Sequence, residues 1–273
     1  MPYWVSMLVG SVDFIDGRGH TFDDLLYKNV KAALSSSNVN ISRREERETR
    51  RLHEELFSRL PDGSYVYISG STHFYSTNGE AICKLLGKEL AKLQSIVLVT
   101  GGFFGVGDTV AKSFHDKRKK LGVSMNLYHS MPIKDPADRS RQTRQREDGT
   151  MEPSPYGETI FLGNSVRQCN TASTRVFNIC ILIEGGPSAA YEVQQFTWNG
   201  AMVIPIKSTG GAAGGKFHVP SCIYHAPLGI SESDWSMLSN ETAAVEDIVA
   251  SVVHIVEICF QIGGGKKPPS KTK

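Results

Sequence analysis

Short apolar runs alternate with longer amphipathic segments along most of the chain. Runs of Val, Ile and Leu that end at glycines are typical of buried strands, whereas apolar residues spaced three and four apart are typical of helices. The predicted strands are Tyr65–Ser69, Ile96–Thr100, Val123–His129, Thr159–Leu162, Ile179–Ile183 and Ala201–Ile206. The predicted helices are Asn78–Leu93, Gly107–Lys120, Ser165–Val176, Val193–Trp198 and Val245–Ile262. This alternation favours an α/β fold in which helices cover both faces of a doubly wound, mostly parallel sheet.

The first part of the chain, residues 1–63, does not follow this alternation and is predicted to be a partly helical N-terminal extension. It holds a strand candidate at Trp4–Gly10 and a helix candidate near Asp23–Leu34. Its third segment, Ser42–Leu60, mixes charges of both signs, which is typical of a helix with a solvated face rather than of an RNA-binding surface. The sequence does not indicate what this extension does.

Two further segments differ in composition from the rest. Residues 136–155 are polar, rich in arginine and framed by prolines, so we expect a loop there. Its place near the strand ends leaves open whether it acts as a lid over a binding site. Residues 266–273 are basic and contain prolines, and they are expected to form a disordered tail. The predicted central domain therefore spans residues 64–265.

The turn that follows the predicted strand Ile179–Ile183 has the sequence EGGPSAAYE, from Glu184 to Glu192. A strand that stops at paired glycines and continues as a helix presents bare backbone N–H groups and the positive end of a helix dipole to a ligand. A carboxylate in the opening turns of the same helix can act on a group that the phosphate positions. The backbone predicted to hold phosphate belongs to Gly185, Gly186, Pro187, Ser188 and Ala189.

Other strands also end at glycines or short polar residues. Because parallel strands bring their carboxyl ends to one edge of the sheet, we expect these positions to border the same ligand. None is specific alone: the spacing of Gly102–Gly107 does not match the dinucleotide-binding fingerprint, and a single glycine often only permits a tight turn. The positions expected to lie beside the sugar, base or phosphate are Gly70, Ser71, Gly101, Gly102, Gly105 and Asn164.

Taken in order, the glycine turns after Ile68-Ser69 and Val99-Thr100 and the EGGPSAAYE turn resemble the SLOG superfamily. That group includes the Lonely Guy (LOG) phosphoribohydrolases, and the resemblance covers roughly residues 64–207. It implies a Rossmann-like nucleotide-binding domain. The LOG signature is P-G-G-x-G-T-x-x-E with an arginine on the preceding helix, so Glu192 matches the catalytic glutamate and Arg167 matches the catalytic arginine. The implied reaction is hydrolysis of the bond between base and ribose in a nucleoside monophosphate or a related nucleotide.

The residue types suit this chemistry. A carboxylate such as Glu192 can stabilise an oxocarbenium-like transition state and activate water. A permanently charged arginine such as Arg167 can hold the nucleotide or the departing base. An ordinary surface position for Glu192 and a simple ion pair for Arg167 are the alternatives.

The resemblance also implies a homodimer or a higher homo-oligomer, and it implies no metal or organic cofactor. His73, His115 and His129 are scattered without metal-ligand spacing.

The chain departs from the LOG signature at two places. Ser188-Ala189 stands where the enzymes carry Gly-Thr, and Glu184 stands where they carry proline. A carboxylate beside a phosphate site repels the ligand unless the side chain points away. The same turn is similar to that of the SLOG-like region of TRPM channels, where the fold serves as a sensing or structural module. A non-catalytic binder of a nucleotide or an ADP-ribose derivative is therefore the second hypothesis, and a purely structural or partner-binding domain is a weaker third.

Composition limits the partners and the compartment. The formal net charge of +2 is too small to argue for nucleic acid or an anionic membrane as a partner. The most apolar long stretch, Val245–Ile262, carries several ionisable residues and is read as an amphipathic helix rather than a membrane span. The five cysteines form no C-x-x-C pair, which favours core thiols in a reducing compartment. We therefore expect a cytoplasmic protein whose partner is a small-molecule nucleotide; the base and the sugar are left open.

Overall fold

The computed structural model describes residues 39–135 and 144–262. The chain divides into two compact units, residues 1–51 and residues 52–273. The described part of the first unit is the beginning of helix α3 (Val39–Arg59), which agrees with the charged helix expected around Ser42–Leu60.

Several expectations fall outside the described residues. The strand and helix candidates of the N-terminal extension are among them, as are the first part of the arginine-rich loop and the basic tail. The predicted domain boundary between residues 63 and 64 stays a prediction.

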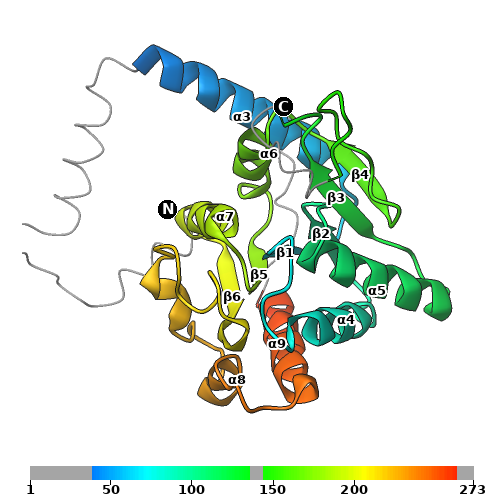
Figure 1. Ribbon diagram of the computed structural model, residues 1–273, viewed down its shortest axis with the longest axis vertical. Helices are drawn as coiled ribbons and strands as arrows, with labels where there is room; N and C mark the ends of the chain where they lie inside the picture. Colours follow the sequence, from blue (N-terminus) through cyan, green and yellow to red (C-terminus); the bar gives the residue numbers. More distant parts are fainter. Residues whose placement is uncertain (1–38, 136–143, 263–273) are drawn as a thin grey trace, which may run out of the picture. The chain divides into compact units, whose positions relative to one another are not determined.

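A six-stranded sheet forms the centre of residues 52–273, and every pair of neighbouring strands in it is parallel (Figure 1). The spatial order is β4-β3-β2-β1-β5-β6. The chain moves outward from β1 to β4 and then returns to the other side of β1, so the direction of winding reverses between β1 and β5. This order confirms the doubly wound, Rossmann-like sheet. The strands are β1 (Ser64–Gly70), β2 (Ile96–Thr100), β3 (Leu127–Met131), β4 (Glu158–Phe161), β5 (Ile179–Ile183) and β6 (Met202–Ile206).

Helices cover both faces of the sheet, as expected (Figure 1). One face packs against α4 (Gly79–Leu90), α5 (Val106–Leu121) and α9 (Val245–Gln261). The other face packs against α6 (Val166–Ser173), α7 (Pro187–Trp198) and the last turns of α3. A short helix that the sequence did not predict, α8 (Glu232–Met237), lies beside α9.

Side chains of β1 alternate between the two hydrophobic cores, one on each face of the sheet. Val66 and Ile68 point to the layer of α4, α5 and α9, whereas Tyr65 and Tyr67 point to the layer of α6 and α7. Because successive strand residues face opposite sides of a sheet, Ser69 shares the side of Tyr67. The end of β1 therefore turns a hydroxyl group toward α7.

Two element boundaries differ from the prediction by four residues or more. β3 begins at Leu127 rather than Val123, because α5 ends in a left-handed cap at Gly122 and Asn126 has a φ of 42°. α7 begins at Pro187 rather than Val193, because proline fits the first helical position, where no N–H bond is needed. The helix therefore starts directly after the glycine pair.

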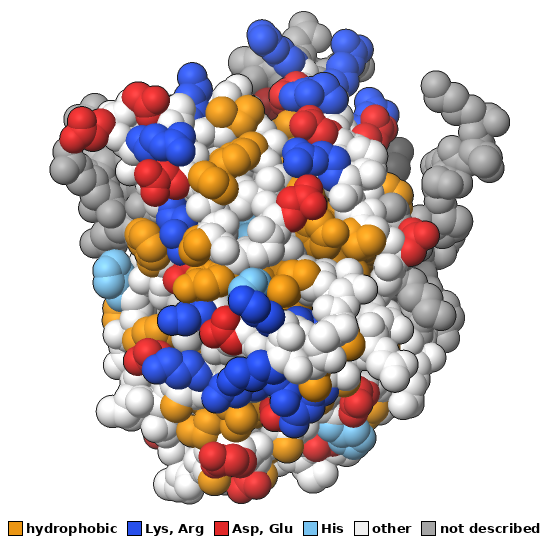
Figure 2. Space-filling view, turned by 90° about the vertical axis from the view of Figure 1, so that its right-hand side faces the viewer, with side chains coloured by type: hydrophobic (Ala, Val, Ile, Leu, Met, Phe, Trp, Pro, Cys, Tyr) orange, Lys and Arg blue, Asp and Glu red, His pale blue; other side chains and the backbone are white. Residues whose placement is uncertain are grey.

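Basic side chains gather in the lower half of the face seen in Figure 2, on the side of the molecule where α5 lies in Figure 1. The last turn of α5 carries the exposed Lys119 and Lys120, and cations at a helix C-terminus are stabilised by the helix dipole. Arg118 in the same turn is buried and donates to the carbonyl oxygen of Leu93. Among the described helices, none is both long and apolar enough to cross a membrane.

Candidate functional site

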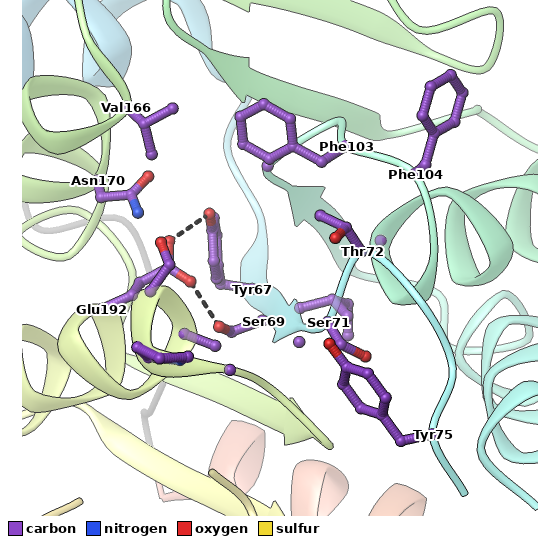
Figure 3. A pocket seen from close by; sticks show the side chains of 18 residues that line it. Tyr67, Ser69, Ser71, Thr72, Tyr75, Phe103, Phe104, Val166, Asn170 and Glu192 are labelled. Atoms are coloured by element: carbon purple, nitrogen blue, oxygen red, sulfur yellow. Dashed lines mark hydrogen bonds between the residues drawn. The ribbon is translucent and has the colours of Figure 1, made fainter. Parts of the chain in front are cut away.

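A cavity of about 260 Å³ lies at the carboxyl ends of β1 and β5, where the strand order reverses. Ligands of open parallel sheets bind at such reversal points. The walls come from the end of β1, the loops that follow β1 and β2, helix α6 and the start of α7 (Figure 3). The cavity brings together most of the site residues predicted from the sequence, namely Gly70, Ser71, Gly101, Gly186, Pro187, Ser188, Ala189 and Glu192.

Glu192 is a buried carboxylate in the wall of this cavity, and only 6 % of the residue is exposed. Its two oxygens accept hydrogen bonds from the Tyr67 hydroxyl, at 2.9 Å, and from the Ser69 hydroxyl, at 2.5 Å (Figure 3). Burial raises the pKa of Glu192, and the two hydrogen bonds act against that rise. The carboxyl group is therefore fixed in position and holds its proton more readily than an exposed glutamate, as suits an acid–base group.

The N-terminus of α7 opens into the same cavity. Gly186 is the N-cap, and no side chain caps the helix there. Pro187 has no N–H group, so the first backbone donors are those of Ser188 and Ala189, and both residues line the cavity. These donors and the positive end of the helix dipole lie within two turns of Glu192, an arrangement of the kind that binds anions in other proteins.

Two predicted polar residues lie away from the cavity. Arg167 is exposed on α6, and Asn164 is exposed in the turn before it; neither lines the cavity. Helix geometry explains the position of Arg167, because residues four apart share a face, and here Val166 and Asn170 are the pair that faces the cavity. Among the described residues, the cavity wall carries no Lys, Arg or His side chain.

Three predicted glycines serve the backbone rather than the cavity wall. Gly185, Gly102 and Gly105 have φ angles of 97°, 71° and 79°, a region that favours glycine. A Cβ atom on Gly102 would lie 2.4 Å from the Sδ atom of Met131, and one on Gly105 would lie 2.4 Å from the backbone of Thr72. These glycines permit close packing beneath the loops that form the cavity.

Glu184, the residue directly before the glycine pair, points away from the cavity. Its carboxylate is fully buried and accepts hydrogen bonds from the Ser71 hydroxyl, at 2.6 Å, and from the backbone N–H groups of Tyr75 and Ser76, at 3.1 and 2.9 Å. It is not among the residues that line the cavity. The carboxylate thus binds the loop after β1 instead of lining the cavity.

Sequence reasoning did not select several residues of the cavity wall. A serine in an otherwise apolar strand was the available signal for Ser69, and the period of two along β1 would have paired it with Tyr67. The aromatic residues and Asn170 carried no comparable signal. The residues missed are Tyr67, Ile68, Ser69, Thr72, Tyr75, Phe103, Phe104, Gly107, Val166 and Asn170.

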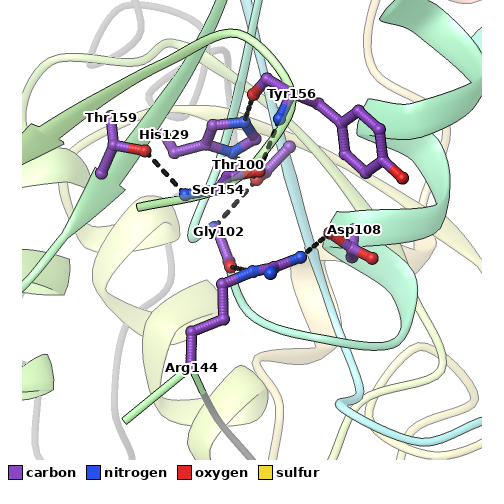
Figure 4. Close-up of polar contacts among 8 residues, drawn as sticks. All are labelled: Thr100, Gly102, Asp108, His129, Arg144, Ser154, Tyr156 and Thr159. Carbon is purple, nitrogen blue, oxygen red and sulfur yellow. Dashed lines mark hydrogen bonds and ion pairs between the residues drawn. The ribbon is translucent and has the colours of Figure 1, made fainter. Parts of the chain in front are cut away.

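A buried polar relay supports the loop after β2 (Figure 4). The backbone N–H of Gly102 donates to Thr100 Oγ1 at 2.9 Å, and Thr100 Oγ1 contacts His129 Nδ1 at 2.8 Å. His129 Nε2 contacts the carbonyl oxygen of Tyr156, which requires the proton on Nε2. The imidazole is fully buried, and burial lowers its pKa from 6.5 to about 4. His129 is therefore a neutral structural group at neutral pH.

Over the described ranges, no cluster of three or more His, Cys, Asp and Glu side chains is arranged as metal ligands. The buried carboxyl groups of Glu184 and Glu192 accept hydrogen bonds from neutral groups.

Comparisons with known proteins gave structural likenesses only. No family model matches the chain, and no curated protein sequence matches it. The X-ray structure of TM1055, a structural genomics target, is 20% identical with a TM-score of 0.42, over 55% of this chain and 78% of that chain. A Moco carrier protein from Chlamydomonas reinhardtii is 17% identical with a TM-score of 0.41, over 71% of this chain and 98% of that chain.

A third structure is DNA processing protein A from Helicobacter pylori, described with its single-stranded DNA binding mode. It is 13% identical with a TM-score of 0.34, over 75% of this chain and 84% of that chain. Likenesses this distant carry no argument about activity, so the classification depends on the chain itself. Its parallel sheet, with glycine turns at the carboxyl ends of β1, β2 and β5, gives this chain a Rossmann-like fold.

Proposed function

We propose that this protein is a nucleotide N-glycosidase that hydrolyses the bond between the base and the ribose of a nucleoside monophosphate or a related nucleotide. The observation that carries the proposal is the position of Glu192, a buried carboxylate in the cavity wall two turns from an uncapped helix N-terminus. The resemblance of the EGGPSAAYE turn to the LOG signature supports the same role.

In the proposed reaction, the α7 N-terminus holds the phosphate and Glu192 lies beside the sugar. The bond between C1′ and the base nitrogen breaks, and its electron pair leaves with the base, which takes up a proton from solvent; Glu192 later returns to solvent the proton that it accepts from water. The carboxylate stabilises the positive charge that develops at C1′ and accepts a proton from the attacking water, whose oxygen joins C1′. The raised pKa of Glu192 favours this proton transfer.

Base release from purified protein tests the proposal. Nucleoside monophosphates, ADP-ribose and NAD are incubated with the wild type and with Glu192→Gln, and free base is measured by chromatography. We expect base release from the wild type and a loss of about 100-fold or more in Glu192→Gln, the size of a lost acid–base group. Glu257→Gln on α9, an exposed position outside the cavity, is the matched control and retains full activity.

The second candidate is a binder or sensor of a nucleotide or ADP-ribose derivative that does not turn it over. One observation favours it: Arg167 is exposed, and the described cavity wall holds no cationic side chain. Tight binding of a panel member without release of base from any of them supports this alternative. Equal base release by the wild type and Arg167→Ala would remove Arg167 from the mechanism.

A homodimer or a higher homo-oligomer also belongs to the proposal, since the resemblance implies it. Size-exclusion chromatography with light scattering measures the assembly directly. A cytoplasmic location is proposed with it, because all five cysteines are free thiols and four of them are buried.

A further inference from the structure

Three aromatic side chains line the cavity, and two of them, Phe104 and Tyr75, lie on the side away from Glu192 (Figure 3). Phe103 and Phe104 lie on the loop after β2, and Tyr75 lies on the loop after β1 (Figure 3). Tyr75 is 70% exposed and Phe104 is 40% exposed. Large aromatic surfaces left open within a cavity are typical of places that a ligand covers.

The loop that carries Tyr75 is held by Glu184. The buried carboxylate accepts the N–H groups of Tyr75 and Ser76 and the hydroxyl of Ser71. Glu184 itself has a φ of 54°, which is unusual for a residue other than glycine, so the surrounding bonds fix a strained backbone at the end of β5. This side chain thereby joins the end of β5 to the loop that presents Tyr75.

The loop that carries Phe104 is held by Arg144. The Arg144 guanidinium donates to the carbonyl oxygen of Gly102 at 3.2 Å and forms an ion pair with Asp108 (Figure 4). It also lies over the ring of Phe104, 4.6 Å from the centroid. Only 11% of the Arg144 side chain is exposed, so one cation supports the ring from outside the cavity.

We infer that Tyr75, Phe103 and Phe104 form a stacking subsite for the planar heteroaromatic ring of the ligand, and that Glu184 and Arg144 are the positioning residues that hold its two loops. The inference rests on the proposed function for the rest of the ligand. The anion site at α7, the carboxylate of Glu192 and the aromatic wall then meet the phosphate, the sugar and the base in turn. Such a subsite prefers ligands with a base to ligands with an aliphatic group at this position, because aromatic side chains stack on every base.

Nucleotide binding tests the subsite, and it is measured in the Glu192→Gln variant because this substitution is expected to prevent turnover. Calorimetry compares adenosine, guanosine and cytidine 5′-monophosphate with ribose 5-phosphate, which lacks the ring. Adding Phe104→Leu or Tyr75→Leu is expected to weaken binding of the nucleotides about tenfold, the loss of one stacked ring, and to leave ribose 5-phosphate unchanged. Trp198→Leu is the matched control, an aromatic residue that is 63% exposed and outside the cavity, and it changes neither affinity.

The same calorimetric measurement tests the two positioning residues, Glu184 and Arg144. Glu184→Gln and Arg144→Lys are expected to reduce the ratio of nucleotide affinity to ribose 5-phosphate affinity, because the rings lose their fixed placement. A general loss of folding lowers both affinities and leaves that ratio unchanged, which would contradict a positioning role.

The inference is overturned if Phe104→Leu and Tyr75→Leu bind the nucleotides as tightly as the parent variant does. It is also overturned if none of the three nucleotides binds. The outcome is separate from that of the proposed function. Ring-dependent binding without base release supports the subsite and refutes the glycosidase, whereas base release without ring dependence does the reverse.

Discussion

Acidification should destabilise this protein through His129, the buried imidazole beneath the loop of the cavity. Its neighbours leave no favourable place for a second proton: Nε2 already donates to the Tyr156 carbonyl, and Nδ1 faces the Thr100 hydroxyl. Asp108 and Arg144 are the charged groups that act on it, and their effects on its pKa oppose each other. Burial is the largest cause of the lowered pKa.

The size of the effect follows from the two pKa values. The folded-state pKa of His129 is about 4, against 6.5 for an exposed histidine. Because the folded value is the lower one, the stabilisation is fully present above pH 6.5 and is lost as the pH falls through 4. At about 1.4 kcal/mol per pH unit, the total is about 3 kcal/mol, a large part of the stability of an ordinary domain.

Urea unfolding at a series of pH values between 7 and 4 measures this loss. Comparison with His129→Gln, which cannot titrate, removes the contribution of the other acidic groups. We expect the wild type to lose about 3 kcal/mol more than the variant. A titration of the His129 ring by NMR, with a midpoint near 4, checks the cause even where the variant folds poorly. A midpoint near 6.5, or parallel losses in the two proteins, would refute the reasoning.

Three further predictions concern other parts of the fold. Glu192→Gln should be more stable than the wild type at neutral pH, and the gain should disappear below pH 4.5. The reason is that burial raises the pKa of Glu192, so that above this pKa the folded wild type must bury a charge that the variant lacks. Urea midpoints at both pH values measure this, and an equal gain at each contradicts it. Gly102→Ala should lower the free energy of unfolding by about 1–3 kcal/mol, because the added Cβ atom meets Met131 and the backbone has a φ of 71°. Gly186→Ala should lower it by less than about 0.5 kcal/mol, because its Cβ atom meets nothing within 4 Å. Similar unfolding midpoints for the two variants would show that this packing argument fails. Of the five cysteines only Cys222 is exposed, so a thiol reagent should modify one equivalent quickly in the native protein and five after unfolding; a second fast equivalent would be inconsistent with the structure.

The architecture was predictable because its signals are local. The strands of a parallel sheet are buried on both faces, so Ile96–Thr100 and Ile179–Ile183 appear as continuous apolar runs, and the helices between them keep an amphipathic period. Boundaries were less predictable, because they depend on single backbone conformations. The positive φ of Asn126 delays β3, and Pro187 starts α7 earlier than its apolar positions indicate.

The candidate site was predictable only in part. The glycine pair and Glu192 follow one strand within a few residues, so the sequence alone brought them together. The surroundings of Glu192 come from β1, more than 120 positions earlier, through the hydrogen bonds of Tyr67 and Ser69. On α6 the sequence indicated Arg167, whereas the rotation of the helix places Asn170 in the cavity wall.

The sequence by itself determined the order of strands and helices, the turn that bears the proposed anion site and the carboxylate that follows it, because each depends on neighbours along the chain. Only the tertiary structure decided which side chains meet Glu192, that Glu184 turns to the loop after β1, and that the aromatic residues of two loops share one cavity. These outcomes depend on sheet order and on helix rotation, which are set by packing between segments far apart in the chain.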